Sequence, residues 1–279
     1  AANGKTEESG KMIERLLSQI EEIRADMASE LLLPKGPGGA VPEESGEEDG
    51  FRTEANFGKE EYLGAVDVVV SHIVEGDVYI MNLTQQLTVY SKKPPYQVFQ
   101  ALRRNNPSPF GGYFQYGDFQ VISASPERFL RMKRGRVVTR PIKGTRKRGE
   151  TEAEDEKLKQ ELQESEKDKS ELLMIVDLER NDLNRVCVPG SVRVPKLFEV
   201  ETYATVFHLE AEVEGELEPG KTVMDLVEAA FPGGSITGAP KLRAMELIDG
   251  LEHGRRGLYT GSMGYLTLDG DCDFNIVIR

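Results

Sequence analysis

The spacing of apolar side chains changes along the chain, and each change predicts a different element. Residues 12–33 carry apolar side chains every three or four positions, which predicts a helix. Residues 34–55 are rich in Pro, Gly and acidic side chains, which predicts a flexible linker. Helical spacing returns at Lys59–Glu75, and Gly76 is expected to end that helix. From 77 to 91 the spacing is two, which predicts one strand.

Further along, short alternating stretches predict strands and longer periodic stretches predict helices. The strands are expected at 111–117, 118–124, 128–133, 136–142, 191–200 and 206–214. The helices are expected at 171–183, 222–231 and 241–251, and a last hairpin runs from 258 to 279. Helices interspersed among antiparallel strands predict an α+β fold. Residues 56–279 are then the main domain, and 1–33 a helical remnant that precedes the linker.

The final strand makes a prediction about the ends of the sequence. Residues 271–279 alternate apolar and polar side chains as a core strand does, and then the sequence stops. A sheet rarely ends on an unpaired core strand. We therefore expect the sequence to be truncated, with the C-terminal part of the main domain missing.

Composition and charge exclude several classes of function. The 279 residues carry a formal net charge of −13, the opposite of what binding to nucleic acid requires. No stretch has the apolar length of a membrane span, and the N-terminus lacks a secretory signal pattern. Cys187 and Cys272 fit neither a metal motif nor a disulfide framework, so we expect a cytoplasmic protein.

Three features could carry chemistry, and each has a structural alternative that the residues alone favour. The segment 232–240, PGGSITGAP, precedes a helix and is either a flexible turn or an anion site made of backbone N–H groups. Lys143 precedes a Gly-Thr turn at a predicted strand end, and is either a solvated cation or a desolvated nucleophile. Glu127 follows a proline at a strand start, and is either structural or a general acid.

Two carboxylates and a histidine are the next candidates. Asp168 and Glu171 are three residues apart on a predicted helix and share one face, which suits Mg²⁺ because it prefers oxygen ligands. A solvated helix surface is the alternative, and it is stronger for Asp168 than for Glu171, which adjoins an apolar run. His208 lies on the polar side of a predicted strand, where it faces either water or a site.

The last hairpin brings together a possible carboxylate-binding pair. A two-residue turn at 269–270 places Arg279 opposite Thr260 and beside Tyr259. An arginine and a tyrosine at one end of a sheet can hold a carboxylate between them. An ordinary exposed pair is the alternative.

The order of the motifs is more specific than any single one. The chain resembles the chorismate-binding enzymes, which include anthranilate synthase component I, aminodeoxychorismate synthase component I, and the isochorismate and salicylate synthases. Over residues 56–279 it has that family's motifs in order: SPERF, PIKGTR, ELLMIVDLERNDLNRV, FHLEAEVEG, FPGGSITGAPKLRAMELID and YTGSMGYL…NIVIR. The resemblance implies two packed, mostly antiparallel sheets with outer helices, and a Mg²⁺-dependent site between the sheets.

The resemblance also implies roles for individual residues. Glu171 is expected to bind Mg²⁺, with Asp168 in the neighbouring acidic position. Glu127 is expected to act as general acid on the departing hydroxyl, and His208 to stand near the ring of the substrate. The residues expected to bind chorismate are Tyr259 and Arg279, at a carboxylate, and Ser235, Gly238 and Thr145.

Within the family, position 143 separates two products. Anthranilate synthases resemble one another in having alanine there, whereas aminodeoxychorismate synthases have lysine, as this chain does. A lysine amine can attack ring C2 as the C4 hydroxyl leaves, and ammonia from a glutamine amidotransferase partner can then add at C4. The resemblance thus implies synthesis of 4-amino-4-deoxychorismate for para-aminobenzoate and folate. Anthranilate synthesis and a non-catalytic truncated fragment are the alternatives.

Three departures from the family pattern affect what is expected of these residues. The N-terminal portion, which in full-length members of the family carries an additional sheet layer and often an amino-acid site, is largely missing, so we expect the sequence to be truncated at both ends. The family's Gln in a Tyr-Gln-Val segment is replaced here, in Tyr79-Ile80-Met81. The family's GGGIVADS-like strand and the glutamates after it, which complete the metal site, are not in the sequence. We therefore expect the isolated 279 residues to turn over chorismate poorly.

Overall fold

The structure is a computed structural model, and it describes Ser18 and residues 52–279. Residues 51–279 form one compact unit. Ser18 is helical, and the rest of the predicted helix 12–33 lies outside the described residues. Within the described part, every helix is too short or too polar to cross a membrane.

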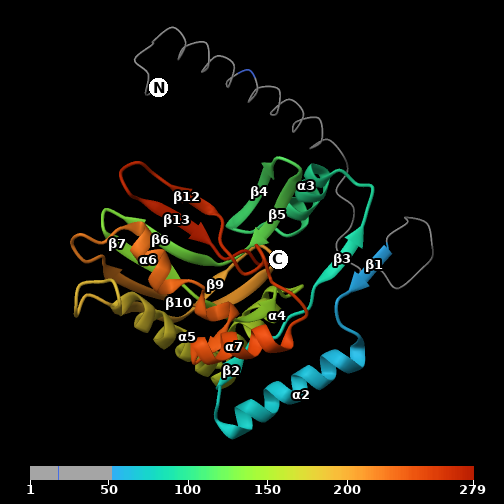
Figure 1. Cartoon of the computed structure of the whole chain (residues 1–279), viewed down its shortest axis with the longest axis horizontal. Coiled ribbons are helices and arrows are strands. Elements are labelled where there is room, and N and C mark those ends of the chain that lie inside the picture. Colours follow the sequence, from blue (N-terminus) through green and yellow to red (C-terminus); the bar gives the residue numbers. More distant parts are fainter. Residues whose placement is uncertain (1–17, 19–51) are drawn as a thin grey trace. The chain divides into compact units, whose positions relative to one another are not determined.

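A seven-stranded antiparallel sheet is the centre of this unit (Figure 1). Its strand order is β12-β13-β6-β7-β10-β8, and β9 also pairs with β10. The strands are β6 (Arg128–Lys133), β7 (Arg136–Arg140), β8 (Ile142–Lys147), β9 (Arg193–Thr202), β10 (Val206–Glu216), β12 (Gly264–Leu266) and β13 (Cys272–Asn275).

Short ladders and helices complete the fold. The two-stranded antiparallel ladders join β1 (Arg52–Ala55) to β3 (Leu87–Tyr90), β2 (Ile80–Met81) to β11 (Gly238–Ala239), and β4 (Phe110–Tyr116) to β5 (Phe119–Ser125). The helices are α2 (Lys59–Glu75), α3 (Pro95–Asn105), α4 (Glu152–Glu164), α5 (Glu166–Asn184), α6 (Val223–Ala230) and α7 (Lys241–Leu251), with a 3-10 turn at Gly234–Ile236. This arrangement confirms the predicted α+β class.

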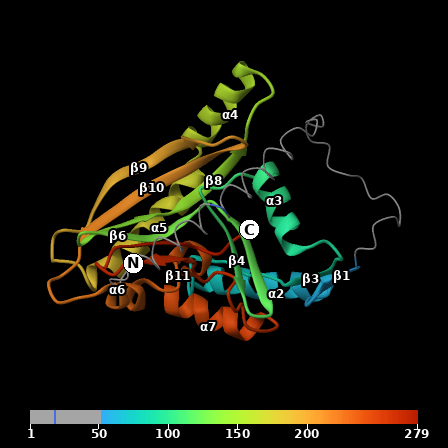
Figure 2. The same ribbon diagram turned by 90° about the horizontal axis from the view of Figure 1, so that it is seen from above.

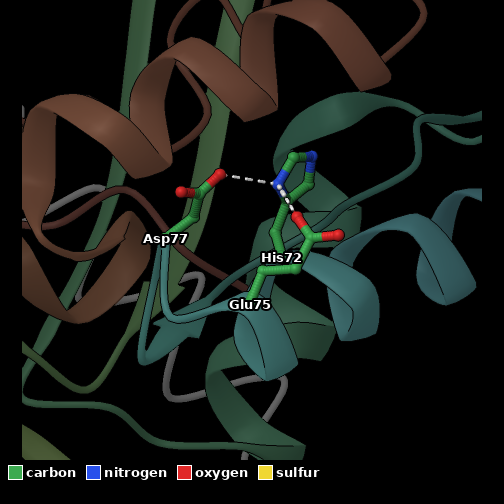
Figure 3. Close-up of side chains that lie close together, drawn as sticks. All are labelled: His72, Glu75 and Asp77. Carbon is green, nitrogen blue, oxygen red and sulfur yellow. Dashed lines mark hydrogen bonds and ion pairs between the residues drawn. The ribbon is translucent and has the colours of Figure 1, made fainter.

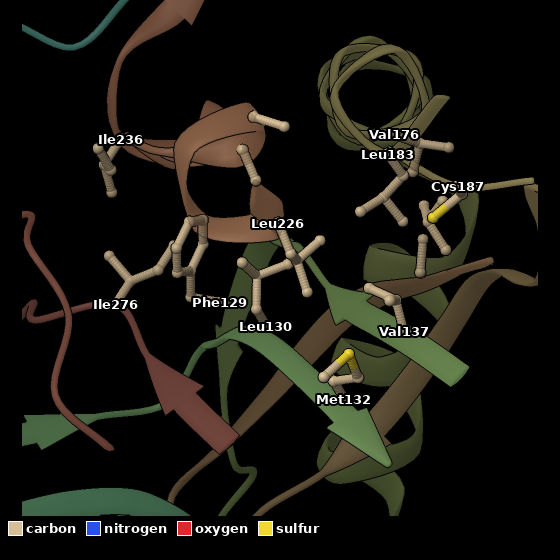
Figure 4. Close-up of a cluster of buried hydrophobic side chains, with 14 of the residues drawn as sticks. Phe129, Leu130, Met132, Val137, Val176, Leu183, Cys187, Leu226, Ile236 and Ile276 are labelled. Atoms are coloured by element: carbon tan, nitrogen blue, oxygen red, sulfur yellow. The ribbon is translucent and has the colours of Figure 1, made fainter. Parts of the chain in front are cut away.

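The hydrophobic core lies between the large sheet and the helices α5 and α6. Figure 2 shows α5 running beside β10, and Figure 4 shows side chains of both helices meeting those of β6 and β7. Alternation along β10 buries Leu209, Ala211 and Val213, whereas α5 buries residues three or four apart. The buried side chains that α5 and α6 contribute include Leu172, Val176, Leu183, Leu226 and Ala229.

The pairing of β8 with β10 contains a β-bulge. Thr145 lies opposite His208 and Lys143 lies opposite Leu209, so Gly144 is an extra residue on β8. The sequence predicted a strand end and a turn at this point, and that prediction is wrong. The chain continues as β8 because β10 is long enough to pair with β7 and then with β8, which the local sequence does not reveal.

Several other predicted elements can be compared with the structure. The helix at 59–75 is confirmed, and Gly76 ends it with φ +83°. The single strand predicted over 77–91 is wrong, because β2 and β3 pair with different partners. Between them, Asn82 N donates to Thr237 O at 2.9 Å and Gln86 N donates to Asn56 Oδ1 at 2.8 Å. The predicted linker is also too long by four residues at its end, since Arg52–Ala55 form β1.

We expect Gly144→Ala to destabilise the protein strongly. Gly144 has φ +73°, and an added Cβ would lie 2.8 Å from Leu162 Cδ1 and 2.9 Å from Asp168 Cβ. Left-handed backbone and a clash in a packed interior together predict a loss of about 2–5 kcal/mol in the free energy of unfolding. Denaturant titration measures that loss. Gly135→Ala is the matched control, since Gly135 has φ +80° and nothing within 4 Å of an added Cβ. Equal losses for the two variants would contradict the steric explanation.

Candidate active site

Glu127 lies buried between β5 and β6, with 4% of its surface exposed. Its backbone is fixed on both sides, since Ile276 N donates to Glu127 O at 3.1 Å and Glu127 N donates to Ser125 Oγ at 3.2 Å. Within the described part of the chain, Glu127 Oε1 and the hydroxyl of the buried Ser235 have no hydrogen-bond partner. Unpaired buried polar atoms are costly, so these two atoms mark a place that suits a polar ligand.

Lys143 reaches the same place from β8. Its Nζ donates a hydrogen bond of 3.0 Å to Ser235 O, and its side chain is half-buried. Its positive charge also favours the ionised form of Glu127. The structure therefore brings together Glu127, Lys143 and Ser235, three of the residues that the sequence singled out.

The burial of Glu127 and the charges around it suit a proton donor. Burial raises the pKa of Glu127 to about 7, although the positive charge of Lys143 opposes the rise. At neutral pH a large fraction of Glu127 therefore keeps its proton. A carboxyl group in this state can donate a proton to a leaving group.

His208 and Thr145 form a neighbouring pair across the bulge. Thr145 Oγ1 and His208 Nδ1 lie 2.9 Å apart, and the edge of the Tyr203 ring contacts the imidazole with centroids 5.4 Å apart. Burial, and then the positive charge of Arg279, lower the pKa of His208 to about 4. The imidazole is therefore neutral at pH 7, where it can accept or donate a hydrogen bond but is not a cation.

The two predicted metal ligands differ in their surroundings. Asp168 Oδ2 accepts a hydrogen bond of 3.0 Å from Arg146 Nη2. Glu171 Oε1 lies 3.9 Å from Lys167 Nζ, and the side chain of Glu171 is 32% exposed. Among residues 52–279, no third carboxylate, histidine or cysteine joins these two at a distance that would close a metal site. Glu171 thus has oxygens available for a cation, whereas Asp168 is committed to an arginine.

The structure gives Gly238 a packing role that the sequence did not suggest. Gly238 lies opposite Met81 in the ladder of β11 with β2. An added Cβ would lie 2.3 Å from Ile80 O and 2.8 Å from Ala244 Cβ. Its missing side chain is therefore required for strand pairing, and its contact with substrate stays a prediction.

The predicted pairing of Arg279 with Thr260 is wrong. Thr260 N donates to Val277 O at 2.8 Å, whereas Arg279 O accepts from Ala124 N of β5 at 2.8 Å. The chain leaves the hairpin at this point, since β13 ends at Asn275. Within the described part, no interaction joins Arg279 to Tyr259, so their shared carboxylate stays a prediction.

Tyr259 lies beside a separate cavity of about 250 Å³. The cavity is also lined by Gln85, Glu252 and Arg256. Arg256 Nη1 donates to Ile236 O at 2.8 Å, so the cavity adjoins the residue after Ser235.

Sequence reasoning missed a buried charged group next to Glu127. Lys241 Nζ contacts Asp182 Oδ2 at 2.5 Å, and Thr139 Oγ1 donates to Glu179 Oε2 at 3.0 Å. Burial, and then the negative charge of Glu127, raise the pKa of Glu179 well above its usual value. The partner of Asp182, Lys241, comes from α7, which is distant in sequence. The available signal was the helical spacing of Glu179 and Asp182, which puts them on the buried face of α5.

His72, Glu75 and Asp77 also lie close enough to resemble a metal site (Figure 3). His72 Nδ1 lies 2.8 Å from Asp77 Oδ2 and 4.0 Å from Glu75 Oε2. Asp77 already pairs with Arg243 of α7 at 2.9 Å. We interpret the group as a clasp between the end of α2 and α7, because the guanidinium supplies the positive charge that a cation would.

Comparisons with known proteins point in one direction. A family model described as chorismate binding enzyme matches residues 3–279. Aminodeoxychorismate synthase component 1 of Bacillus subtilis (strain 168) is 47% identical over 225 residues, which are 81% of this chain and 48% of that protein. Anthranilate synthase component 1 of Aquifex aeolicus (strain VF5) is 44% identical over 225 residues, which are 81% of this chain and 46% of that protein.

Structural similarity leads to the same group of proteins. The crystal structure of anthranilate synthase component I from Streptococcus pneumoniae TIGR4 matches with a TM-score of 0.75 at 35% identity. That match covers 94% of this chain and 57% of the other. The chain spans about half the length of the curated relatives it matches.

The buried acid predicts a pH-dependent stability that Glu127→Gln removes. The unfolded chain ionises Glu127 near pH 4.5, whereas the folded state does so only near pH 7. Between these values the folded state binds more protons, so this group's contribution to stability falls as the pH rises. Relative to the wild type, Glu127→Gln should gain about 3 kcal/mol between pH 4 and pH 8. Urea titrations at both pH values measure the gain. Glu228→Gln, at an exposed position on α6, is the control for the substitution itself. A constant difference between wild type and Glu127→Gln would contradict the raised pKa.

Proposed function

Because the chain belongs to the chorismate-binding enzymes, we propose that it is the part of an aminating enzyme that converts chorismate and ammonia to 4-amino-4-deoxychorismate. The observation that carries the proposal is the position of Lys143. Its amine lies in the buried group with Glu127 and the backbone of Ser235. This group contains a nucleophile and an acid, which are the two functions that amination at C4 requires.

Overall similarity does not choose between the two products of the family. The identities to the aminodeoxychorismate and anthranilate synthases above are 47% and 44%. Position 143 separates them on chemical grounds, since a lysine amine can form a bond to the ring and an alanine cannot. The proposal therefore rests on Lys143 and not on overall identity.

The proposed reaction has two displacement steps. Lys143 first loses its ammonium proton to solvent and reacts as the neutral amine. In the first step, the lone pair of Lys143 Nζ bonds to ring C2, the double bond shifts, and the C4 hydroxyl leaves as water with a proton from Glu127. The Glu127 carboxylate then takes the extra proton from the new ammonium. In the second, ammonia bonds to C4, the double bond shifts back, and the bond from C2 to the nitrogen of Lys143 breaks as Glu127 returns the proton to that nitrogen. The Glu127 carboxylate then takes a proton from the new C4 ammonium. The sum is chorismate plus ammonia giving the amino product plus water, with Lys143 and Glu127 regenerated.

The remaining candidate residues would bind and orient the substrate. Neutral His208, fixed by Thr145, would offer a hydrogen bond near the ring without adding charge. Arg279 would bind a carboxylate of the substrate. Its positive charge contributes to the lowered pKa of His208, so it lies close enough to act at the same site. Tyr259 would contribute from the side of the separate cavity.

Mg²⁺ is the cofactor that the family resemblance implies, and the donor chemistry of α5 fits it. Glu171 offers carboxylate oxygens that are partly exposed, and Mg²⁺ usually takes one or two such ligands together with its substrate. Asp168 is the second donor, and it would share its charge between the ion and Arg146. A bound Mg²⁺ would neutralise carboxylate charge on the substrate.

The ammonia would come from a partner. Relatives named component 1 imply a second component, and we propose that it is a glutamine amidotransferase that releases ammonia. The product would serve para-aminobenzoate and folate synthesis in the cytoplasm.

Product analysis of Lys143→Ala is the main test. The wild type, supplied with chorismate, an ammonium salt and Mg²⁺, is expected to form 4-amino-4-deoxychorismate. Lys143→Ala should lose this product, and Lys143→Arg should lose it too, because a guanidinium is a poor nucleophile. Liquid chromatography with mass detection separates the products. Lys147→Ala, at an exposed position on the same strand, should retain wild-type output. Formation of anthranilate by the wild type would contradict the proposal and favour the second candidate, amination at C2.

The acid role of Glu127 predicts a pH dependence of the rate. Because the carboxyl must be protonated to act, kcat/KM for chorismate should fall as the pH rises through about 7. Glu127→Gln should lower kcat by roughly 10²–10⁴-fold and lose this limb of the profile. Steady-state kinetics from pH 6 to 9 test both statements. An unchanged profile in Glu127→Gln would assign the acid to another group.

A further inference from the structure

We propose that the ion pair of Glu252 and Arg256 acts as a positioning device for Lys143. The inference rests on the proposed function, in which Lys143 is the nucleophile. Arg256 does not contact Lys143, and it acts through the backbone carbonyls of the loop at 235–237. A positioning residue of this kind would set where the amine stands without taking part in the chemistry.

The amine of Lys143 is located by a single backbone oxygen. Ser235 O accepts from Lys143 Nζ at 3.0 Å and from Asn82 Nδ2 at 3.2 Å. Asn82 Nδ2 also donates to Thr237 O at 3.2 Å, and Asn82 N donates to the same oxygen at 2.9 Å. The position of the Lys143 amine therefore depends on how firmly Ser235 and Asn82 are fixed.

Arg256 donates hydrogen bonds to both the loop at 235–237 and the segment at Asn82. Its Nη1 donates to Ile236 O at 2.8 Å, and its Nη2 donates to Asn82 O at 2.6 Å. Together with the bonds made by Asn82, three consecutive carbonyls, 235 to 237, each have a fixed donor. The segments that meet here follow β2, precede β11 and follow α7, so the guanidinium joins parts that are distant in sequence.

Glu252 fixes the guanidinium in turn. Arg256 Nε donates to Glu252 Oε2 at 2.9 Å, and Nη2 donates to Oε1 at 2.6 Å. Oε1 also accepts from the backbone N and the hydroxyl of Thr84, both at 2.9 Å. The side chains of Glu252 and Arg256 are 6% and 14% exposed. The attraction between two buried charges adds little to the stability of the fold, because burial removes both from water. The contribution of this pair is that its hydrogen bonds fix the direction of the guanidinium.

Only an arginine provides this geometry. The planar guanidinium offers donors in fixed directions, and here it serves two carbonyls and one carboxylate at once. A lysine amine is one point with a flexible stem, so it cannot reach the same four acceptor contacts. In Arg256→Lys the charge persists while the carbonyls of Ile236 and Asn82 are released, and the loop that bonds Lys143 is free to shift.

The test compares Arg256→Lys with Arg255→Lys. Arg255 is the adjacent exposed arginine, and it makes no hydrogen bond or ion pair within residues 52–279. We expect Arg256→Lys to lower kcat by about 10²-fold, the cost of misplacing a reacting group by about 1 Å, with KM for chorismate within twofold of wild type. Arg255→Lys should match wild type. A purely structural role would lower the melting temperature and the amount of active enzyme while leaving kcat per active site unchanged, and that result would overturn the proposal.

A second readout does not require turnover. Acetic anhydride acylates lysine amines, and peptide mass spectrometry measures the rate at Lys143 against the exposed Lys147 in the same molecule. This ratio should change several-fold in Arg256→Lys and stay constant in Arg255→Lys. If Arg256→Lys does not fold, Glu252→Gln keeps an oxygen for Thr84 and should change the ratio in the same direction. An unchanged ratio in folded variants would overturn the proposal.

The two experiments separate the two claims. If the wild type forms anthranilate while the acylation ratio changes in Arg256→Lys, the proposed function fails and the positioning stands. If the wild type forms 4-amino-4-deoxychorismate and Arg256→Lys forms it at the same kcat, the positioning fails and the proposed function stands.

Discussion

The β-bulge at Gly144 decides what Lys143 can do. If the ladder continued regularly from Thr145 opposite His208, Gly144 would lie opposite Leu209 and Lys143 opposite Glu210, a buried acid. A lysine there would be held in an ion pair on the sheet. The bulge moves Lys143 opposite Leu209, and its amine bonds to a backbone carbonyl instead. Only glycine fits the bulge, because its φ is +73° and neighbouring side chains occupy the space of a Cβ.

The buried carboxyls near this bulge follow one electrostatic rule. Burial removes each from water and raises its pKa, even where a cation lies beside it. Asp182 has Lys241 and Glu210 has Arg140, whereas Glu127 forms no salt bridge within residues 52–279 and its pKa rises to about 7. The core thus has a second consequence beyond stability, since it prepares an acid that works at neutral pH.

Rigid backbone links the nucleophile to the rest of the fold. Lys143 is bonded to a loop whose carbonyls are held by Asn82 and Arg256, and Arg256 is held by Glu252. These residues come from four separate parts of the sequence, and their meeting depends on the short pairing of β2 with β11. Gly238 allows that pairing, which explains why a glycine stands in a loop first considered for anion binding.

The sequence by itself determined the family, most helices and the identity of the residues at the centre of the candidate site. Helix limits were predictable because capping and spacing are local, as at Gly76 and along 241–251. The order of the motifs identified Glu127, Lys143 and Ser235, because a motif is recognised from residue types and their order alone. Only the tertiary structure decided the bulge at Gly144, the ladder of β2 with β11, the partner of Asp182 and the clasp of Arg256. Each of these is a contact between distant segments, and local spacing carries no information about which segments meet.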